Sequence, residues 1–331
     1  MTPDTFGPNV SVVIPCHNAG RTIRRALQSV SAQTLPVAEI LVIVDDSTDN
    51  SVREIEASNI TTRILQVDAN NAAAARNAGI AAAHGQWVAF LDADDVWLPA
   101  HLASAGQLLD AGNDIAYCSF AEAFHDFPDR PAASFMPRFP TRNPWPIETA
   151  TPGLSDGDFL DLFLLCGIFT LPTCVIRRDI LASIGGFDTT QPRRHDIDLW
   201  LRVIHNRTWA YDPRPTVRFC ADTPGSISRK IASSERYMLV ALKKNLGRYP
   251  RGAMPTIIHN VAEAGLRRTL VHGDRGDLVR FAREACPFLS TRDLGLAVLS
   301  IAFPARLRGA YLNRRTSPQP VMSASRKHPP S

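Results

Sequence analysis

The chain has 331 residues, of which 45% are hydrophobic and 21% charged, an ordinary composition for a globular protein with a sizeable core. Its net charge of +4 at pH 7 is too small to indicate a nucleic-acid partner, and no run of about 18 apolar residues predicts a membrane span. The six cysteines are scattered without a CxxC pair, so a zinc site is not expected. Because the N-terminus does not resemble a signal peptide, we expect a cytoplasmic protein with reduced thiols.

Short apolar runs alternate with segments of helical periodicity over the first 120 residues. The expected strands are Val10–Ile14 (ended by Pro15), Ile40–Val44, Arg63–Val67, Val88–Leu91 and Asp114–Ser119. The expected helices are Arg21–Gln33, a segment capped by Ser47 or Thr48 and ending near Ala57, Asn71–Ala83, and Pro99–Leu109. This alternation predicts βαβ units, and therefore an α/β fold with a Rossmann-like, mostly parallel sheet flanked by helices.

The pattern is looser after Phe120. Phe127–Pro152 contains seven prolines, which predicts a loop or lid. Further elements are then expected: helical segments at Asp158–Leu165 and Ile197–Ile204, a strand at Thr173–Arg177, and a turn at Gly185–Asp188. Helices with basic faces follow from about Ser233, and the Pro- and Ser-rich residues 316–331 are expected to be disordered.

Three carboxylates, Asp92, Asp94 and Asp95, directly follow the apolar run Val88–Leu91. Clustered carboxylates repel one another and raise each other's pKa unless a cation neutralises them. Oxygen ligands of this kind suit Mg²⁺ or Mn²⁺, often together with substrate phosphates. The alternative is a solvated acidic turn before the helix that begins near Pro99.

Other polar residues follow the first two strands. Pro15 to Asn18 and the pair Asp45-Asp46 would share the carboxyl edge of the sheet with Asp92–Asp95, and ligands of open α/β sheets bind beyond that edge. A nucleotide can lie there, with one carboxylate on its base or ribose and a metal on its phosphates. Arg76 could add positive charge to the phosphates, although the sequence around Arg76 taken alone favours a surface arginine.

The chain resembles the family 2 glycosyltransferases, which have the GT-A fold. Five segments match family motifs in order: Val10–Asn18 (I-P-x-Y-N, with His17 for the tyrosine), Ser29–Thr34 (S-V-x-x-Q-T), Glu39–Asp49 (E-I-I-V-V-D-D-G-S-T-D), Ala75–Gly79 (A-R-N-x-G) and Phe90–Trp97 (F-L-D-A-D-D-x-W). In the third segment, Val44 replaces the first aspartate, Asp45 the second, and Asp46 the glycine. The resemblance implies binding of a nucleotide sugar by Pro15, Asn18, Asp45, Arg76, Asp92 and Asp94, with a Mg²⁺ or Mn²⁺ cofactor on Asp94 and Asp95.

Later segments are also similar to the family. Arg177–Asp188 resembles R-R-x-x-L-x-x-x-G-G-F-D, and His195–Arg202 resembles E-D-x-D-L-W-x-R, with His195 in place of the glutamate. The resemblance makes Asp196 the general base, for which a helix N-cap is the alternative. It also places His195, Asp198 and Trp200 on the acceptor side, although a structural role at the helix N-terminus would suffice for Asp198.

The implied layout is a GT-A glycosyltransferase domain over residues 1–230, with a nucleotide-sugar half at 8–120 and an acceptor half at 150–230. A helical C-terminal region at 231–315 and a tail at 316–331 follow. The implied reaction is inverting transfer from a nucleotide diphosphate sugar, above all a UDP-sugar, to a glycan or lipid-linked acceptor in cell-envelope polysaccharide synthesis. Two interpretations stay open for the apolar residues and the four arginines at 294–315. One is a core helix with a basic solvated end, and the other is peripheral contact with the inner face of the cell membrane.

Two other functions compete with this interpretation. A haloacid-dehalogenase-type phosphatase would use a D-x-D-x-V motif such as Asp92–Val96, but that motif normally follows the first strand, and the first lysine of this chain is Lys230. The second is a sugar-nucleotide-binding protein without catalysis, which His195 in place of glutamate leaves open. Replacement of Asp196 discriminates, since only the enzyme needs it as a base.

Overall fold

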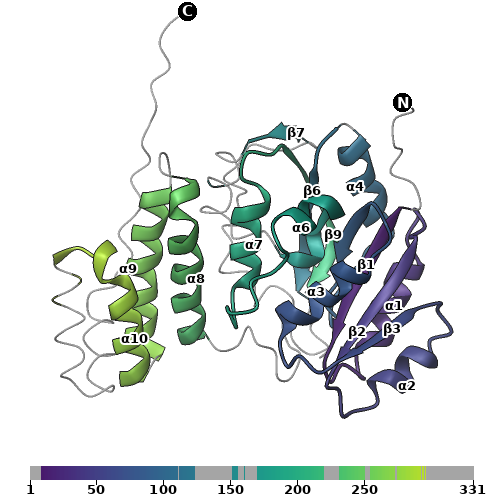
Figure 1. Ribbon diagram of the computed structural model, residues 1–331, viewed down its shortest axis with the longest axis horizontal. Coiled ribbons are helices and arrows are strands. Elements are labelled where there is room, and N and C mark those ends of the chain that lie inside the picture. Colours follow the sequence, from purple (N-terminus) through teal and green to yellow (C-terminus); the bar gives the residue numbers. More distant parts are fainter. Residues whose placement is uncertain are drawn as a thin grey trace, which may run out of the picture.

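The computed structural model shows an α/β protein in which one large sheet is flanked by helices, and a helical C-terminal part lies beside it (Figure 1). It describes residues 9–110, 112–123, 151–155, 160, 170–219, 231–249, 254–272, 274–291, 293 and 295. None of the helices within these ranges is both long and apolar enough to cross a membrane.

One sheet in the described part of the chain contains nine strands, in the order β3-β2-β1-β4-β8-β6-β9-β5, with β7 paired to β9. The strands are β1 (Val10–Cys16), β2 (Glu39–Asp45), β3 (Arg63–Val67), β4 (Trp87–Phe90), β5 (Val96–Trp97), β6 (Ile115–Ala123), β7 (Thr151–Leu154), β8 (Cys174–Arg177) and β9 (Trp209–Phe219). The four strands β3-β2-β1-β4 are parallel, as predicted. The other half is mixed, because β8 lies antiparallel between β4 and β6 while β6 and β9 are parallel.

Strand β1 is covered on both faces, which explains its continuous apolar sequence. Val12 and Ile14 pack into one hydrophobic cluster and Val13 into the other. The prediction that Pro15 ends this strand was wrong, because β1 continues to Cys16. A proline is tolerated there because β4 pairs only with Val10 to Val13 of β1. On that side of β1, no neighbouring strand requires a backbone N–H from residue 15.

The helices occupy both faces of the sheet. They are α1 (Ile23–Ser31), α2 (Ser51–Glu56), α3 (Ala72–Ala82), α4 (His101–Asp110), α6 (Arg178–Ser183), α7 (His195–Val203), α8 (Ile231–Asn245), α9 (Met254–His272) and α10 (Arg275–Ala285). Core residues of α1 and α4 belong to one cluster, and those of α3, α6 and α7 to the other.

Helices α8, α9 and α10 are the predicted helical region, and α8 packs against α7 (Figure 1). Their core residues, such as Leu242, Ile258 and Phe281, belong to the same cluster as Trp200 of α7 and Phe90 of β4. The C-terminal helices therefore share one hydrophobic core with the sheet.

The predicted cap of the second helix was wrong. Helix α2 begins at Ser51, and Asp49 accepts a hydrogen bond from the Ser51 backbone N–H over 2.9 Å. Ser47 instead donates to the Cys16 carbonyl over 3.2 Å, which joins the ends of β1 and β2.

Several predictions concern residues outside the described ranges. These are residues 127–150 of the predicted loop or lid, the helical segment at 158–165 apart from Leu160, the apolar and basic segment at 294–315 apart from Gly295, and the tail at 316–331. The last two residues of the predicted loop, Thr151 and Pro152, instead begin strand β7, which pairs with β9. The membrane contact proposed for 294–315 stays a prediction.

Candidate active site

The polar ends of β2, β1 and β4 lie side by side, because these three strands are adjacent in the sheet. The shared edge predicted from the sequence is thereby confirmed. It brings Asp45, Asn18 and the Asp92–Asp95 run to one rim of the molecule.

Asp45 is buried and binds the backbone of the loop between β3 and α3. Its carboxylate accepts hydrogen bonds from the N–H groups of Ala69, Asn70 and Asn71 over 2.8, 2.9 and 3.0 Å. These bonds fix the loop that leads into the Arg76 helix. Any contact of Asp45 with a nucleotide would be made by a carboxylate that already has three backbone partners.

Asn18 joins the loops that follow β1 and β2. Its side-chain oxygen accepts from the Thr48 backbone N–H over 2.9 Å, and its own N–H donates to the Ser47 hydroxyl over 3.0 Å. Both Asn18 and Asp46 have left-handed backbones, with φ of 48° and 46°. Asp46 occupies the position where the family motif has glycine, a residue that adopts this conformation without steric cost. Pro15 is half-buried directly before this loop.

Arg76 connects the two halves of the site. It lies on α3, is 7% exposed, and pairs through Nη2 with the carboxylate of Asp92 after β4. Its Nη1 donates to Nε2 of His195 on α7 over 3.0 Å. The surface-arginine alternative is excluded, because this side chain is buried between two predicted site residues.

His195 is a neutral hydrogen-bond acceptor in this position. Burial, followed by the positive charge of Arg76, lowers the pKa of His195 to about 4, and the charges of Asp196 and Asp92 oppose this only partly. At neutral pH the ring therefore has no charge, and Nε2 is free to accept from the guanidinium. A glutamate would have given Arg76 a second negative partner, whereas His195 leaves Asp92 as the single carboxylate bonded to Arg76 among the described residues.

Two neighbours of Arg76 in the A-R-N-x-G segment, Asn77 and Gly79, determine the position of α3. Asn77 donates to the Phe187 carbonyl over 2.9 Å and accepts from the Phe187 N–H over 2.8 Å, which holds the G-G-F-D turn against α3. Gly79 lets α3 approach β1, since a Cβ there would lie 2.3 Å from a methyl group of Val13. The Phe187 ring then lies edge-on to His195, with ring centroids 5.7 Å apart.

The carboxylates after β4 differ in exposure. Asp92 and Asp94 are half-buried, and Asp95 is 1% exposed. The Asp94 backbone carbonyl accepts from Arg25 of α1 over 3.0 Å. No group of three or more His, Cys, Asp or Glu side chains forms a ready metal cage among the described residues. The oxygen donors nevertheless fit Mg²⁺ or Mn²⁺, because such sites commonly combine one or two carboxylates with phosphates and water.

Asp196 lies in the first turn of α7, next to His195. It is half-buried, and within the described part of the chain its carboxylate has no hydrogen-bond partner. The N-cap of α7 is Arg194, not Asp196. The alternative in which Asp196 is the helix N-cap is therefore wrong.

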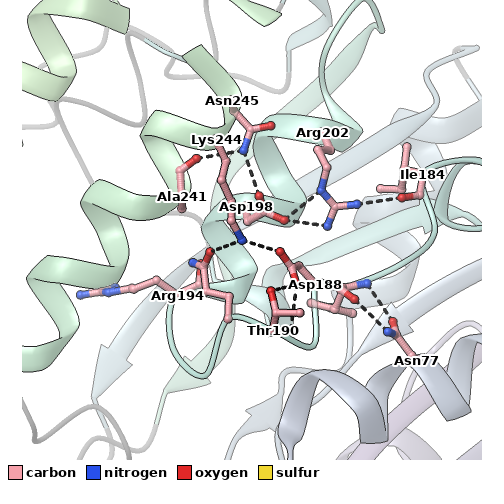
Figure 2. A network of polar contacts seen from close by, with 12 residues as sticks. Asn77, Ile184, Asp188, Thr190, Arg194, Asp198, Arg202, Ala241, Lys244 and Asn245 are labelled. Atoms are coloured by element: carbon pink, nitrogen blue, oxygen red, sulfur yellow. Dashed lines mark hydrogen bonds and ion pairs between the residues drawn. The ribbon is translucent and has the colours of Figure 1, made fainter. Parts of the chain in front are cut away.

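Asp198 and Trp200, two further residues of α7 predicted to lie on the acceptor side, are both buried. Asp198 is buried and accepts hydrogen bonds from Arg202 over 2.9 Å and from Asn245 of α8 over 3.0 Å (Figure 2). These contacts favour the structural role for Asp198. Trp200 has an exposed fraction of 0% and packs in the core.

The sequence did not point to Gln191, Lys244 or Asn245. Gln191 and Lys244 join the loop before α7 to α8, and Asn245 joins α7 itself to α8. The sequence had indicated only the basic character of α8. The residues around Lys244 and Asn245 in the sequence do not indicate their partners, which lie about 50 positions earlier in the chain.

Comparison with known proteins identifies the family. The sequence model of "Glycosyl transferase family 2" matches residues 11–185, which is more than half of the chain. The protein belongs to glycosyl transferase family 2. Membership of this family excludes the haloacid-dehalogenase-type phosphatase. It also explains why the polar motifs follow several different strands.

Curated glycosyltransferases and polysaccharide-synthesis proteins match part of this chain. One is the UDP-Glc:alpha-D-GlcNAc-diphosphoundecaprenol beta-1,3-glucosyltransferase WfgD of Escherichia coli, 41% identical over 91 residues, or 27% of this chain and 36% of that one. Another is the succinoglycan biosynthesis protein ExoO of Rhizobium meliloti, 37% identical over 106 residues, or 31% and 30% of the two chains. The matches thus span about a third of these relatives' length.

Solved structures show that the GT-A fold is shared. Residues 1–349 of S. aureus TarS in complex with UDP-GlcNAc align with a TM-score of 0.67 at 16% identity, covering 92% of this chain and 91% of that one. The mannosyltransferase PcManGT from Pyrobaculum calidifontis, in complex with GDP-Man and Mn2+, aligns with a TM-score of 0.53 at 18% identity, covering 96% and 90%.

Proposed function

We propose that this glycosyltransferase family 2 member transfers a sugar, with inversion, from a nucleoside diphosphate sugar to a hydroxyl group. The observation that carries the proposal is the Arg76 guanidinium, which contacts the strand-end carboxylate Asp92 and, through His195, the helix that presents Asp196. This pair of contacts would hold the proposed donor site next to Asp196, the candidate base. Residues 8–120 would form the nucleotide-sugar half, and residues 150–230 the acceptor half.

The chemistry follows from these positions. The acceptor hydroxyl forms a bond to the anomeric carbon on the face opposite the nucleotide, the bond to the diphosphate oxygen breaks, and Asp196 takes the hydroxyl proton. Asp92, held by Arg76, would contact the donor. A divalent cation, when bound at Asp94 and Asp95, would stabilise the charge of the leaving nucleoside diphosphate.

The donor and acceptor classes are proposed from the curated relatives. The name of WfgD specifies a UDP-sugar donor and a diphosphoundecaprenol-linked acceptor, and that of ExoO specifies polysaccharide synthesis. We accordingly propose a UDP-sugar as donor and a glycan or lipid-linked acceptor in cell-envelope polysaccharide synthesis.

Calorimetric titration tests the proposal. UDP, GDP and their common sugar conjugates are titrated into the full chain with and without Mn²⁺, and release of nucleoside diphosphate from the bound conjugate is then followed. We expect Mn²⁺-dependent binding of one nucleotide class, and loss of turnover without loss of binding in Asp196→Asn. Binding without any turnover in the wild type would instead favour the sugar-nucleotide-binding alternative, and unchanged turnover in Asp196→Asn would show that Asp196 is not the base. No binding at all would overturn the transferase proposal.

A further inference from the structure

Helix α7 begins at a residue whose backbone conformation is unfavourable unless other contacts stabilise it. Its N-cap residue, Arg194, has a left-handed backbone with φ of 55°, which residues other than glycine rarely adopt. Such a residue persists where surrounding contacts over-determine it, and such positions are common at functional sites. His195 and Asp196 follow immediately, so the geometry of Arg194 sets the direction in which the candidate base leaves the loop.

Gln191 supplies the contact that holds Arg194. Its side chain is 2% exposed, and its Nε2 donates to the Arg194 carbonyl over 2.9 Å. The same nitrogen is within 3.3 Å of the Tyr237 carbonyl on α8. One buried amide therefore joins the entry of α7 to the C-terminal helices.

Lys244 of α8 completes this connection (Figure 2). Its ammonium group donates to the Gln191 side-chain oxygen over 3.3 Å and forms an ion pair with Asp188 of the G-G-F-D turn. Asp188 in turn accepts from the Thr190 backbone N–H over 2.8 Å. Lys244 is thereby joined to two residues of the segment before α7, Asp188 and Gln191.

The body of α7 is attached to α8 and the turn after it separately. Asn245 donates to Asp198 over 3.0 Å, and the Tyr249 hydroxyl donates to the Leu201 carbonyl over 2.8 Å. Because these contacts hold the helix itself, loss of Gln191 or Lys244 should loosen the loop and first turn while α7 stays docked.

We infer that Gln191 and Lys244 are positioning residues for Asp196, which makes the C-terminal helix α8 part of the catalytic unit. The inference rests on the proposed function for the role of Asp196. Within the part of the chain that the structure describes, no hydrogen bond or ion pair joins Gln191 or Lys244 directly to Asp92 or Arg76, so their effect should fall on turnover and not on donor binding.

The test compares Gln191→Ala and Lys244→Met with Lys243→Met in the full chain. Lys243 is the matched control, because it is the neighbouring lysine on α8 but pairs with Glu284 of α10. Three quantities are measured: the dissociation constant of UDP-N-acetylglucosamine, UDP-glucose or GDP-mannose, whichever wild type binds; release of nucleoside diphosphate from it; and hydrogen–deuterium exchange across residues 188–199.

We expect turnover to fall by about 10- to 100-fold in Gln191→Ala and Lys244→Met, with donor affinity within about twofold of wild type. Amide exchange should rise at 192–197 and stay unchanged in α3, while Lys243→Met behaves as wild type in all three measurements. Gln191→Glu keeps an acceptor for Lys244 but loses both Nε2 donor contacts, so it should fold and still lose turnover.

Wild-type turnover and exchange in both Gln191 variants would overturn the inference, as would an equal loss of donor affinity. If wild type binds no sugar nucleotide, the proposed function fails, and the exchange measurement alone decides whether α8 positions the start of α7. The two failures are thereby distinguishable.

Discussion

Arg76 donates a hydrogen bond to Nε2 of His195 over 3.0 Å while its other terminal nitrogen pairs with Asp92. Three segments far apart in the chain meet at this guanidinium: α3, the end of β4, and the first turn of α7. Because the histidine is neutral at pH 7, the contact is that of a charged donor with a neutral acceptor.

The His195 contact depends on an acceptor, not on a charge. We expect His195→Gln, whose side-chain oxygen can accept from Arg76, to keep the free energy of unfolding at pH 7.5 within about 1 kcal/mol of wild type. His195→Ala leaves a charged donor without its acceptor, which should lower the free energy of unfolding by about 1–3 kcal/mol. Urea denaturation measures both, and equal stability of the two variants would contradict the expectation.

Arg76→Lys should be nearly as damaging as Arg76→Ala. A single ammonium cannot reach Asp92 and His195 together as the forked guanidinium does. We expect a loss of about 2 kcal/mol in the free energy of unfolding, below the cost of breaking a fully buried pair because the Asp92 side chain stays 30% exposed. Urea denaturation measures this loss. A lysine variant as stable as wild type would show that the second contact adds nothing.

Acid should destabilise the protein partly through His195. The pKa of His195 is lowered to about 4 from an ordinary value of 6.5, so between these pH values the unfolded chain binds a proton that the folded chain does not. Stability is therefore fully present above pH 6.5 and falls as pH decreases toward 4. In urea denaturation at pH 7.5 and pH 5.0, we expect wild type to lose about 1–2 kcal/mol more than His195→Gln.

His101 should add to the same loss, since complete burial lowers its pKa to about 3. The acid sensitivity of His195→Gln is consequently reduced and not abolished. If wild type and His195→Gln lost equal stability over this range, His195 would have to be protonated more readily than its environment indicates.

Gly79→Ala tests the close approach of α3 to β1. The added methyl group would lie 2.3 Å from a methyl group of Val13, so α3 must shift. We expect a loss of about 1–3 kcal/mol in the free energy of unfolding, together with weaker nucleotide binding because Arg76 moves with the helix. Gly247→Ala is the control, since no atom lies within 4 Å of the added carbon and the change should stay within about 0.5 kcal/mol.

Nucleotide binding should no longer depend on Mn²⁺ when Asp94 or Asp95 is replaced. We expect Mn²⁺ to strengthen nucleotide binding to wild type at least about tenfold, and to have no effect on Asp94→Asn or Asp95→Asn. Asp277→Asn on α10 is the control, since that carboxylate pairs with Arg280 outside the site. Mn²⁺ dependence that survives in Asp95→Asn alone would assign the ion to Asp94, the more exposed of the two carboxylates.

The sequence by itself determined the parallel half of the sheet and the edge that carries the site. Short apolar runs rich in β-branched residues, such as Ile40–Val44, indicate buried strands, and the polar residues that follow parallel strands share an edge of the sheet. The family resemblance also assigned Arg76 and Asp92 to one nucleotide-sugar site, and in the structure these two side chains are paired.

Tertiary structure alone decided which partners those residues take. The antiparallel insertion of β8 between β4 and β6, the pairing of Arg76 with His195, and the connection of Gln191 to Lys244 each join segments separated by 53 or more residues. Contacts of this kind leave no periodic signal, because packing of the whole core selects them. For the same reason, α8 appeared in the sequence as a basic helix, and only the fold showed it holding the start of α7.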